Sequence, residues 1–282
     1  MRNQLLLILL IAVIFLSGCI TQPSGTTVSN VGLSRTLSSD TKQAKTSMPV
    51  TFILSVKNLA SENANDISAE LLNLTYWTVE NQLQHLDELL PNDLYKFSWI
   101  AYSPSTPNNT FIPIANVFYN METNAKLKLR VYDNNYLNTL KSDERGKIQE
   151  GSALLSSTIS KNTPVTVKIS IQQPFILTEY SQRFPFVIEI KNAGLGKVYR
   201  DNAVYPPAES FVDYFRFSFS SNSTITCDYD SQELVKLDNG IKTIACRLSV
   251  TQDDVSNSAD FPVDFTISYM YLDKASAKIQ VV

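Results

Sequence analysis

The sequence predicts an all-β protein made of two β-sandwiches, and three observations lead to that class. Apolar and polar residues alternate along several stretches, as at Phe52, Leu54 and Val56, which is the period of a strand with one buried face. Clusters of Asn, Asp, Pro and Ser separate these stretches, as turns separate short strands. The first half of the chain also matches the second half, so we expect one kind of domain to occur twice.

The chain begins with the order of segments found in a secretory signal. A charged start with Arg2 is followed by an apolar stretch from Leu5 to Leu16 and then by two small residues. This order predicts a signal peptide over residues 1–18. The apolar stretch is shorter than the roughly 20 residues that cross a bilayer. We therefore expect cleavage, with an uncleaved membrane anchor as the alternative.

A cysteine stands directly after this segment. The tetrad Leu16-Ser17-Gly18-Cys19 resembles the lipobox of prokaryotic lipoproteins, and the resemblance implies cleavage before Cys19 and a lipid on its sulfur. Residues 19–29 are otherwise polar and rich in Ser, Thr, Gly and Pro, which predicts a flexible tether behind the lipidated cysteine. A single acyl chain anchors a protein only marginally, so stable anchoring implies the several chains that such lipoproteins carry.

Two gapless matches define the internal repeat. The matched pairs are Met48–Asn58 with Gln182–Asn192, and Phe111–Val131 with Phe261–Val281. The second match places Tyr119 on Tyr269. Because each half carries the same succession of alternating stretches, we predict one sandwich over residues 30–133 and another over residues 163–282.

Two stretches depart from the strand pattern. Residues 78–90 carry apolar side chains at helical spacing, which predicts a short helix before Pro91 or, alternatively, an irregular loop. Residues 134–162 are polar, with a cluster of charges over residues 141–147, and we interpret them as the connection between the domains. Since this segment is long for a connection, we expect part of it to form a helix or an extra strand.

The second half contains the two remaining cysteines, Cys227 and Cys246. An even number of cysteines in a chain sent to an oxidising compartment predicts a disulfide. It would close a loop of about 20 residues, worth about 3 kcal/mol in the chain-entropy model. Between the cysteines, Asp238-Asn239-Gly240 predicts a hairpin turn joining residues 233–237 to residues 241–248. We do not expect zinc, because the only histidine, His85, lies far away in the sequence.

The residues also carry a resemblance to a domain family. In both halves an alternating strand ends in Lys-Asn and is followed by a small polar turn, at residues 57–66 and 191–197. Together with the stretch Leu89–Trp99, this resembles the CARDB-type and related immunoglobulin-like domains of archaeal and bacterial surface proteins. Asn192-Ala193-Gly194 keeps the family's Asn-Xaa-Gly turn, whereas Asn58-Leu59-Ala60 departs from it. The resemblance implies an immunoglobulin-like fold and a non-catalytic surface or adhesion-like module, and it brings no ligand with it.

Composition and motifs argue against several function classes. The net charge is −3 and basic residues are not clustered, so we expect no nucleic-acid partner. There are eight glycines and no glycine-rich phosphate loop. His85 has no serine elbow near it in the sequence, so we expect no Ser-His-Asp triad and no cofactor. Asp228 and Asp230 form one acidic pair and Asp253 and Asp254 another, but they make no complete calcium loop; we interpret them as solvated carboxylates and expect no metal.

Aromatic residues and sequons give further candidates. We expect most aromatic side chains to fill the cores, with Tyr76-Trp77 and Tyr205-Pro206-Pro207 as the better exposed ones. Asn73, Asn108 and Asn222 stand in Asn-Xaa-Ser/Thr sequons and are candidate glycosylation sites. Chance matches in a chain rich in Asn and Thr are the alternative.

These observations predict a membrane-anchored, extracytoplasmic lipoprotein that acts as a non-enzymatic structural or binding module. The expected partners are the membrane, through the lipid anchor, and another cell-surface protein or a glycan. The alternative is a secreted hydrolase that depends on carboxylates or a metal, or a carbohydrate-binding accessory protein. Convergence of His85 or of Asp228, Asp230 and Asp253 with other polar groups in a cleft would favour that alternative.

Overall fold

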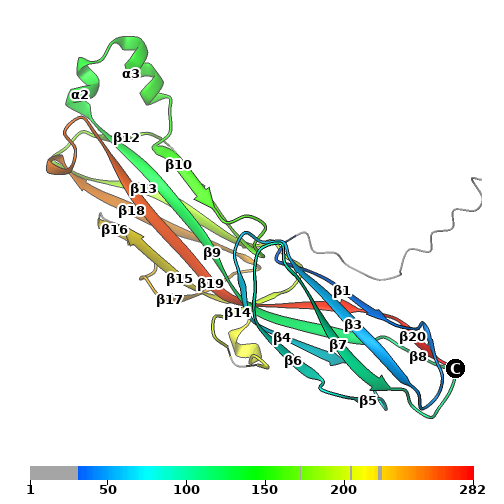
Figure 1. Cartoon of the computed structure of the whole chain (residues 1–282). Coiled ribbons are helices and arrows are strands. Elements are labelled where there is room, and N and C mark those ends of the chain that lie inside the picture. The colour runs from blue at the N-terminus through cyan, green and yellow to red at the C-terminus, as the bar shows by residue number, and fades with distance from the viewer. Residues whose placement is uncertain (1–30, 172, 204, 222–223) are drawn as a thin grey trace, which may run out of the picture.

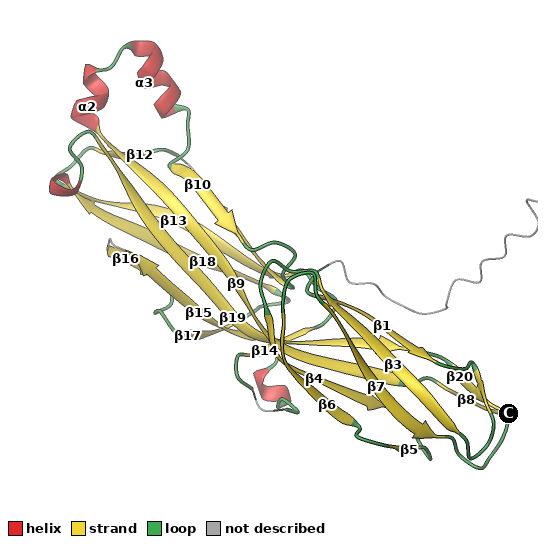
Figure 2. Ribbon diagram, viewed as in Figure 1, coloured by secondary structure: helices red, strands yellow, loops and turns green. Residues whose placement is uncertain are grey.

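The computed structural model describes residues 31–171, 173–203, 205–221 and 224–282, and these residues form an elongated, nearly all-β structure (Figures 1 and 2). The predicted all-β class is therefore confirmed. The signal segment, Cys19, the tether and Asn222 lie outside the described residues.

One long sheet runs through both halves of the molecule, and a four-stranded sheet faces each half. The long sheet has the order β17-β15-β19-β9-β4-β6, with β10 and β12 paired to β9 and with β14 paired to β19. Its strands are β4 (Ala64–Leu72), β6 (Leu83–Leu89), β9 (Ile114–Asp133), β10 (Leu154–Ile159), β12 (Phe175–Leu177), β14 (Lys197–Arg200), β15 (Tyr214–Ser221), β17 (Glu233–Lys236) and β19 (Ser258–Ser276).

The two facing sheets have matching orders. In the first half the order is β1-β3-β7-β5, and in the second half it is β11-β13-β18-β16. Their strands are β1 (Leu33–Ser39), β3 (Pro49–Asn58), β7 (Leu94–Tyr102), β5 (Thr78–Val79), β11 (Val165–Ser170), β13 (Ser181–Asn192), β18 (Ile241–Thr251) and β16 (Thr224–Cys227). Alternate residues along these strands are buried, as in β3, so each half is a sandwich with its core between two sheets.

The two central strands of the long sheet are unusually long. β9 has 20 residues and β19 has 19, and they pair antiparallel without a break from Ser258↔Tyr132 to Ser276↔Ile114. At about 3.3 Å per residue, such strands extend for about 65 Å. They cross the waist of the molecule, the region around Asn120 and Met270 where the two sandwiches meet (Figure 1).

The sharing of β9 and β19 corrects the predicted domain boundaries. The end of the chain, β20 (Ile279–Val281), lies in the first half, where it pairs with β2 (Gln43–Ala44) and β8 (Asn109–Phe111). The end of β9 lies in the second half, where it pairs with β10 and β12. Residues 30–133 and 163–282 are thus not separate bodies. The physical reason is that β9 contains neither Pro nor Gly, so nothing interrupts the strand at the waist.

The two halves nevertheless repeat the same contacts. The Asn58 amide donates to the carbonyl of Glu62, and the Asn192 amide donates to the carbonyl of Gly196. The hydroxyl of Tyr119 accepts from the Leu33 N–H, as that of Tyr269 does from the Val165 N–H. The match of Tyr119 with Tyr269 thus corresponds to an equivalent structural role in the two halves.

Other local predictions have mixed outcomes. The helix and the loop predicted for residues 78–90 are both wrong, because β5 and β6 lie there and β6 pairs with β4; pairing with the sheet overrides the helical spacing. The segment 134–162 forms α2 (Asn134–Thr139), α3 (Ser142–Gln149) and β10, as expected for a connection with structure of its own. The two helices lie at the tip of the second half (Figure 2).

The turn at residues 238–240 is present, but the hairpin is not. Asp238 and Ile241 exchange backbone hydrogen bonds, and both Asn239 and Gly240 have positive φ, as a type I′ turn requires. The flanking strands nevertheless separate, because β17 pairs with β15 in the long sheet while β18 pairs with β13 in the facing sheet. This turn therefore connects the two layers of the second sandwich.

Candidate functional site

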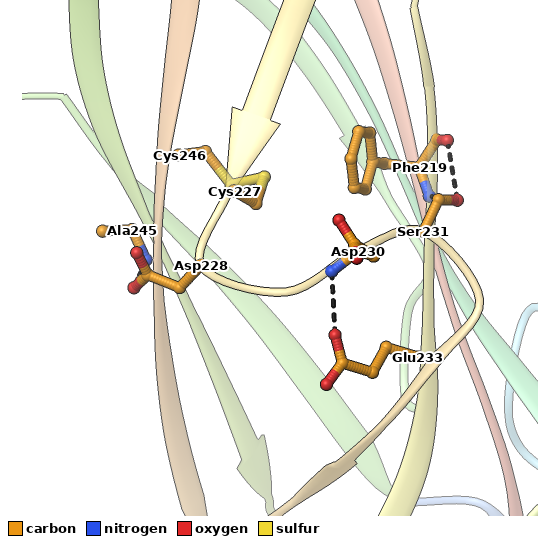
Figure 3. Close-up of a disulfide and its surroundings, with 8 residues drawn as sticks. All are labelled: Phe219, Cys227, Asp228, Asp230, Ser231, Glu233, Ala245 and Cys246. Atoms are coloured by element: carbon orange, nitrogen blue, oxygen red, sulfur yellow. Dashed lines mark hydrogen bonds between the residues drawn. A yellow bond between two sulfur atoms is a disulfide. The ribbon is translucent and has the colours of Figure 1, made fainter.

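The carboxylates that the sequence suggested do not converge. Asp228 accepts from the Ala245 N–H, and the Asp230 N–H donates to Glu233 (Figure 3). Asp253 lies in the short 3-10 helix η2 (Gln252–Asp254) and accepts from the Tyr180 hydroxyl. Among the described residues, no group of three or more His, Cys, Asp or Glu side chains could hold a metal ion.

The predicted disulfide between Cys227 and Cys246 is confirmed. The two residues are directly opposite each other on the antiparallel pair β16 and β18, with Cα atoms 4.0 Å apart (Figure 3). Cys246 is fully buried. The bridge joins the edge strand of the facing sheet to its neighbour, so its role is to hold that edge in place.

The candidate surface residues have different environments. Tyr76 is 84% exposed, whereas Trp77 is buried against Phe52 and Phe111. Two of the sequon asparagines, Asn73 and Asn108, are among the described residues. Both side chains are exposed, and both residues have a positive φ. These are geometric facts about the positions, and the use of the sequons stays a prediction.

His85 lies between two partners that the sequence reasoning did not connect to it. Ser68 and His85 face each other across β4 and β6, with 3.4 Å between the Ser68 Oγ and His85 Nδ1 atoms. The other ring nitrogen, Nε2, is 3.2 Å from Asp87 Oδ1, and the Asp87 side chain is 99% exposed. A serine, a histidine and a carboxylate therefore do contact one another in a row on the surface of these strands.

A β-bulge in β4 places acidic and polar groups beside His85. Asn65 pairs with Asn120 and Ser68 pairs with Phe118, so β4 has one more residue than β9 between these pairs. Asp66, inside the bulge, has a φ of 51°. Bulges re-aim side chains, and here the Asp66 carboxylate accepts from the Asn120 amide at 3.0 Å.

An insertion in the second repeat covers this surface. Tyr269 and Ser268 are consecutive on β19, but their partners are Arg200 at the end of β14 and Arg216 in β15. Residues 201–203 and 205–213 are looped out between these two strands and include the 3-10 helix η1 (Glu209–Phe211). We call this segment the waist loop; it lies against the long sheet at the waist, beside β14 (Figure 1).

The waist loop is attached to the sheet by polar and apolar contacts. The Tyr205 hydroxyl donates to Glu70, and its ring makes a T-shaped contact with Phe118, with centroids 4.7 Å apart. Ala203 and Tyr205 belong to a small apolar cluster outside the two sandwich cores, with Phe118, Tyr199, Met270, Leu272 and Val212. Burial raises the pKa of Glu70.

A pocket of about 290 Å³ lies between the waist loop and β6. Its described lining residues include apolar and polar side chains, namely Phe118, Ala203, Tyr205 and Met270 together with Asp66, Ser68, His85, Asn120 and Asn202. Small-ligand sites commonly combine apolar walls with a few convergent polar groups. We take this waist pocket as the candidate functional site.

Sequence reasoning identified two of these residues and missed the others. Tyr205 and His85 were singled out, but their proximity depends on the waist loop folding back over the sheet. Asp66 and Asn120 carry no sequence signal beyond a polar residue inside a strand. The first repeat has one strand, β4, where the second repeat has β14 and β15 with the waist loop between them. This extra length in the second repeat was the available indication of an insertion.

Comparisons with known proteins add little to this geometry. No protein-family model matches the sequence, and no curated protein matches it. Matches among solved structures include a PapD-like domain of human CEP192, with 11% identity over 36% of this chain and 80% of that chain and a TM-score of 0.18.

Two further matches are longer. The secreted serine protease VesC from Vibrio cholerae has 10% identity over 83% of this chain and half of its own, with a TM-score of 0.22. The collagen adhesin CNA from S. aureus has 8% identity over 90% of this chain and 88% of its own, with a TM-score of 0.14. At TM-scores this low, none of the three likenesses supports a conclusion about what this chain does. Within the described part of the chain, no helix is long and apolar enough to cross a membrane.

Proposed function

We propose that this protein is a membrane-anchored, extracytoplasmic lipoprotein that acts as a non-enzymatic binding module. The observation that supports a binding role best is the waist pocket, because an added loop covers the sheet there and leaves a partly apolar, partly polar pocket. The lipobox-like tetrad ending at Cys19 supports the anchor. The disulfide is in keeping with an oxidising compartment.

The position of the first described residues gives this proposal a geometric consequence. The Gly32 N–H donates to the carbonyl of Asn162, and the Gly32 carbonyl accepts from Leu59, so the chain enters the fold at the waist. Eleven residues lie between Cys19 and Val31, and the twelve steps from one to the other, at about 3.3 to 3.6 Å each, span at most about 43 Å. A lipid on Cys19 would therefore hold the elongated molecule by its middle, close to the membrane.

Cell fractionation tests the anchor. We expect the wild-type protein in the membrane fraction and the Cys19→Ala variant outside it, because the variant has no sulfur to carry the lipid. The matched control is the double variant Cys227→Ala/Cys246→Ala, which loses two cysteines but keeps Cys19, and which we expect in the membrane fraction. Equal membrane partition of wild type and Cys19→Ala would contradict the proposal.

The contacts of His85 favour one alternative, a serine-dependent hydrolase. The Ser68 Oγ atom lies 3.4 Å from His85 Nδ1, and His85 Nε2 lies 3.2 Å from Asp87 Oδ1. Against this reading, the orienting carboxylate of a triad is normally buried, whereas Asp87 is almost fully exposed. We expect p-nitrophenyl acetate to be hydrolysed no faster with the purified protein than without it. Catalysis that Ser68→Ala abolishes would favour the hydrolase instead.

A further inference from the structure

Several polar groups of the waist pocket offer hydrogen-bond acceptors to a ligand. The Asn120 amide nitrogen donates to Asp66, and the Asn202 amide nitrogen donates to Asp201. Asn120 Oδ1 is buried and has no hydrogen-bond partner among the described residues. Because a buried, unpaired acceptor is costly, a hydrogen-bond donor that reached this atom would be favoured.

The charge of the pocket has one sign. Asp66 lines it, and the Glu70 carboxylate lies beside it under Tyr205. No lysine or arginine is among its described lining residues. Two guanidinium groups beside the waist loop are engaged elsewhere: that of Arg216 is paired with Asp201 at 2.8 Å, and that of Arg200 lies over the Phe211 ring. A cation entering the pocket would meet the Asp66 carboxylate and no lysine or arginine among the described lining residues.

We propose that the waist pocket binds a small organic ammonium group on an aliphatic stem. The ammonium group would donate to Asn120 Oδ1 and to the Asp66 carboxylate, and the stem would pack on Phe118, Met270 and Ala203. This inference rests on the proposed binding function and names the chemistry of its ligand.

The hydrogen-bonding pattern separates an ammonium ligand from a neutral polyol such as a sugar. An ammonium group has three donors and no acceptor, so acceptor oxygens alone satisfy it. A hydroxyl group both donates and accepts, and a buried sugar would need free donors from the pocket. One N–H of each of the Asn120 and Asn202 amides is already engaged with a carboxylate. The aromatic ring of Tyr205, beside the pocket, adds an attraction for a cation that a neutral ligand lacks.

The methyl group of Met270 provides a direct readout. Met270 lines the pocket, whereas Met48 is exposed at the start of β3, and the sequence has only four methionines. We expect n-butylammonium to shift the ¹³C-methyl resonance of Met270 in a saturable way in the detergent-extracted full chain, without moving that of Met48. The neutral isostere n-butanol and methyl α-glucoside should leave Met270 unchanged. A shift of Met270 by n-butanol or the glucoside equal to that by n-butylammonium, or no shift with any probe, would overturn the proposal.

A charge variant with a matched control tests the role of Asp66. Asn, like Asp, tolerates positive φ, so Asp66→Asn keeps the bulge and removes the charge. We expect the dissociation constant for n-butylammonium to rise at least tenfold in Asp66→Asn. Glu122→Gln removes an exposed carboxylate near Asn120 on β9 that does not line the pocket, and it should leave the constant within about twofold. Equal effects of the two substitutions would contradict a specific contact with Asp66.

A peptide arm distinguishes the sources of the ammonium group. Tighter binding of N-acetyl-lysine methylamide than of n-butylammonium would support a lysine side chain of a partner protein, and the reverse order would support a free small amine. Either order upholds the proposal, provided that the neutral analogue N-acetyl-norleucine methylamide does not bind; its binding would contradict it. Since this readout does not depend on membrane partition, failure here and failure of the lipid anchor are distinguishable.

Discussion

Arg35 and Asp273 form an ion pair that is almost completely shielded from solvent, with side chains 3% and 0% exposed and a Nη2–Oδ1 distance of 2.8 Å. The remaining guanidinium donors of Arg35 reach the carbonyls of Lys274 and Leu33. The Tyr119 hydroxyl donates to the other carboxylate oxygen at 3.5 Å. The pair joins β1 to β19 near the waist, where one half of the molecule passes into the other.

Removing one member of this pair should be strongly destabilising. Asp273→Ala leaves the Arg35 guanidinium buried with neither the carboxylate charge nor a carboxyl oxygen to accept from it, which typically costs about 3–5 kcal/mol. The double variant Arg35→Met/Asp273→Leu removes both charges, and we expect it to recover most of that loss. Urea unfolding measures both free energies. A single variant as stable as wild type would show that the pair does not hold the waist together.

The same carboxylate should give stability an unusual pH dependence. Burial raises the pKa of Asp273 to about 6, above its ordinary value of 3.8, despite the opposing effect of Arg35. The folded state therefore keeps this proton over a range in which the unfolded chain has released it. The contribution is fully present below about pH 4 and is lost as the pH rises through 6, with a slope on the order of 1 kcal/mol per unit.

The pKa of Asp260 is shifted in the opposite direction, so the pH ranges over which Asp260 and Asp273 affect stability do not overlap. Hydrogen bonds from Arg130 are the main cause that lowers its pKa to about 2, so its stabilising contribution is present above about pH 4 and is lost as the pH falls through 2. Urea unfolding between pH 2 and pH 7 should show both windows. The double variant at positions 35 and 273 should lose the slope between pH 4 and 6 alone, and an unchanged slope would contradict the assignment to Asp273.

At the scale of elements, the Cys227–Cys246 bridge fastens the short edge strand β16 to β18. Reduction should lower the free energy of unfolding by about 3 kcal/mol, because the unfolded chain regains the entropy of a loop of about 20 residues. Chemical unfolding with and without a reductant measures this loss. The double variant Cys227→Ala/Cys246→Ala, which has no bridge to reduce, should not respond to the reductant.

Strands were easier to predict from the sequence than their partners. The alternation at Phe52, Leu54 and Val56 is visible because one face of β3 is buried. Residues 83–89 have no clean alternation, since β6 is an edge strand with few buried side chains, and their helical spacing misled the prediction. The Asp238-Asn239-Gly240 turn was recognisable from its residue types, but the separation of β17 and β18 into different sheets depends on contacts distant in sequence.

The candidate site was harder still to predict. Asp66 and Asn120 meet because of a bulge, and a bulge leaves no reliable mark in a single sequence. Tyr205 reaches Glu70 only because the waist loop folds back across β9 and β19. The disulfide was predictable for the opposite reason, since cysteine count and compartment constrain it without any knowledge of the fold.

At the scale of the whole molecule, the shared strands make the two sandwiches depend on each other. The first half needs residues 269–281 from the end of the chain, and the second half needs residues 125–133. We therefore expect a fragment of residues 31–162 to remain unfolded alone and to fold when mixed with residues 163–282. Amide NMR spectra of each fragment and of the mixture check this. A well-dispersed spectrum from the isolated first fragment would contradict the mutual dependence.

The most direct test of the proposed lipoprotein is the intact mass of the protein extracted from membranes. The proposal predicts a chain that begins at Cys19 and carries the added mass of a diacylglyceryl group, with or without a further acyl group, on that residue. Fragmentation should place the added mass on the N-terminal cysteine, because Cys227 and Cys246 are joined to each other. A chain that still begins at Met1 or that carries no lipid would contradict the central claim.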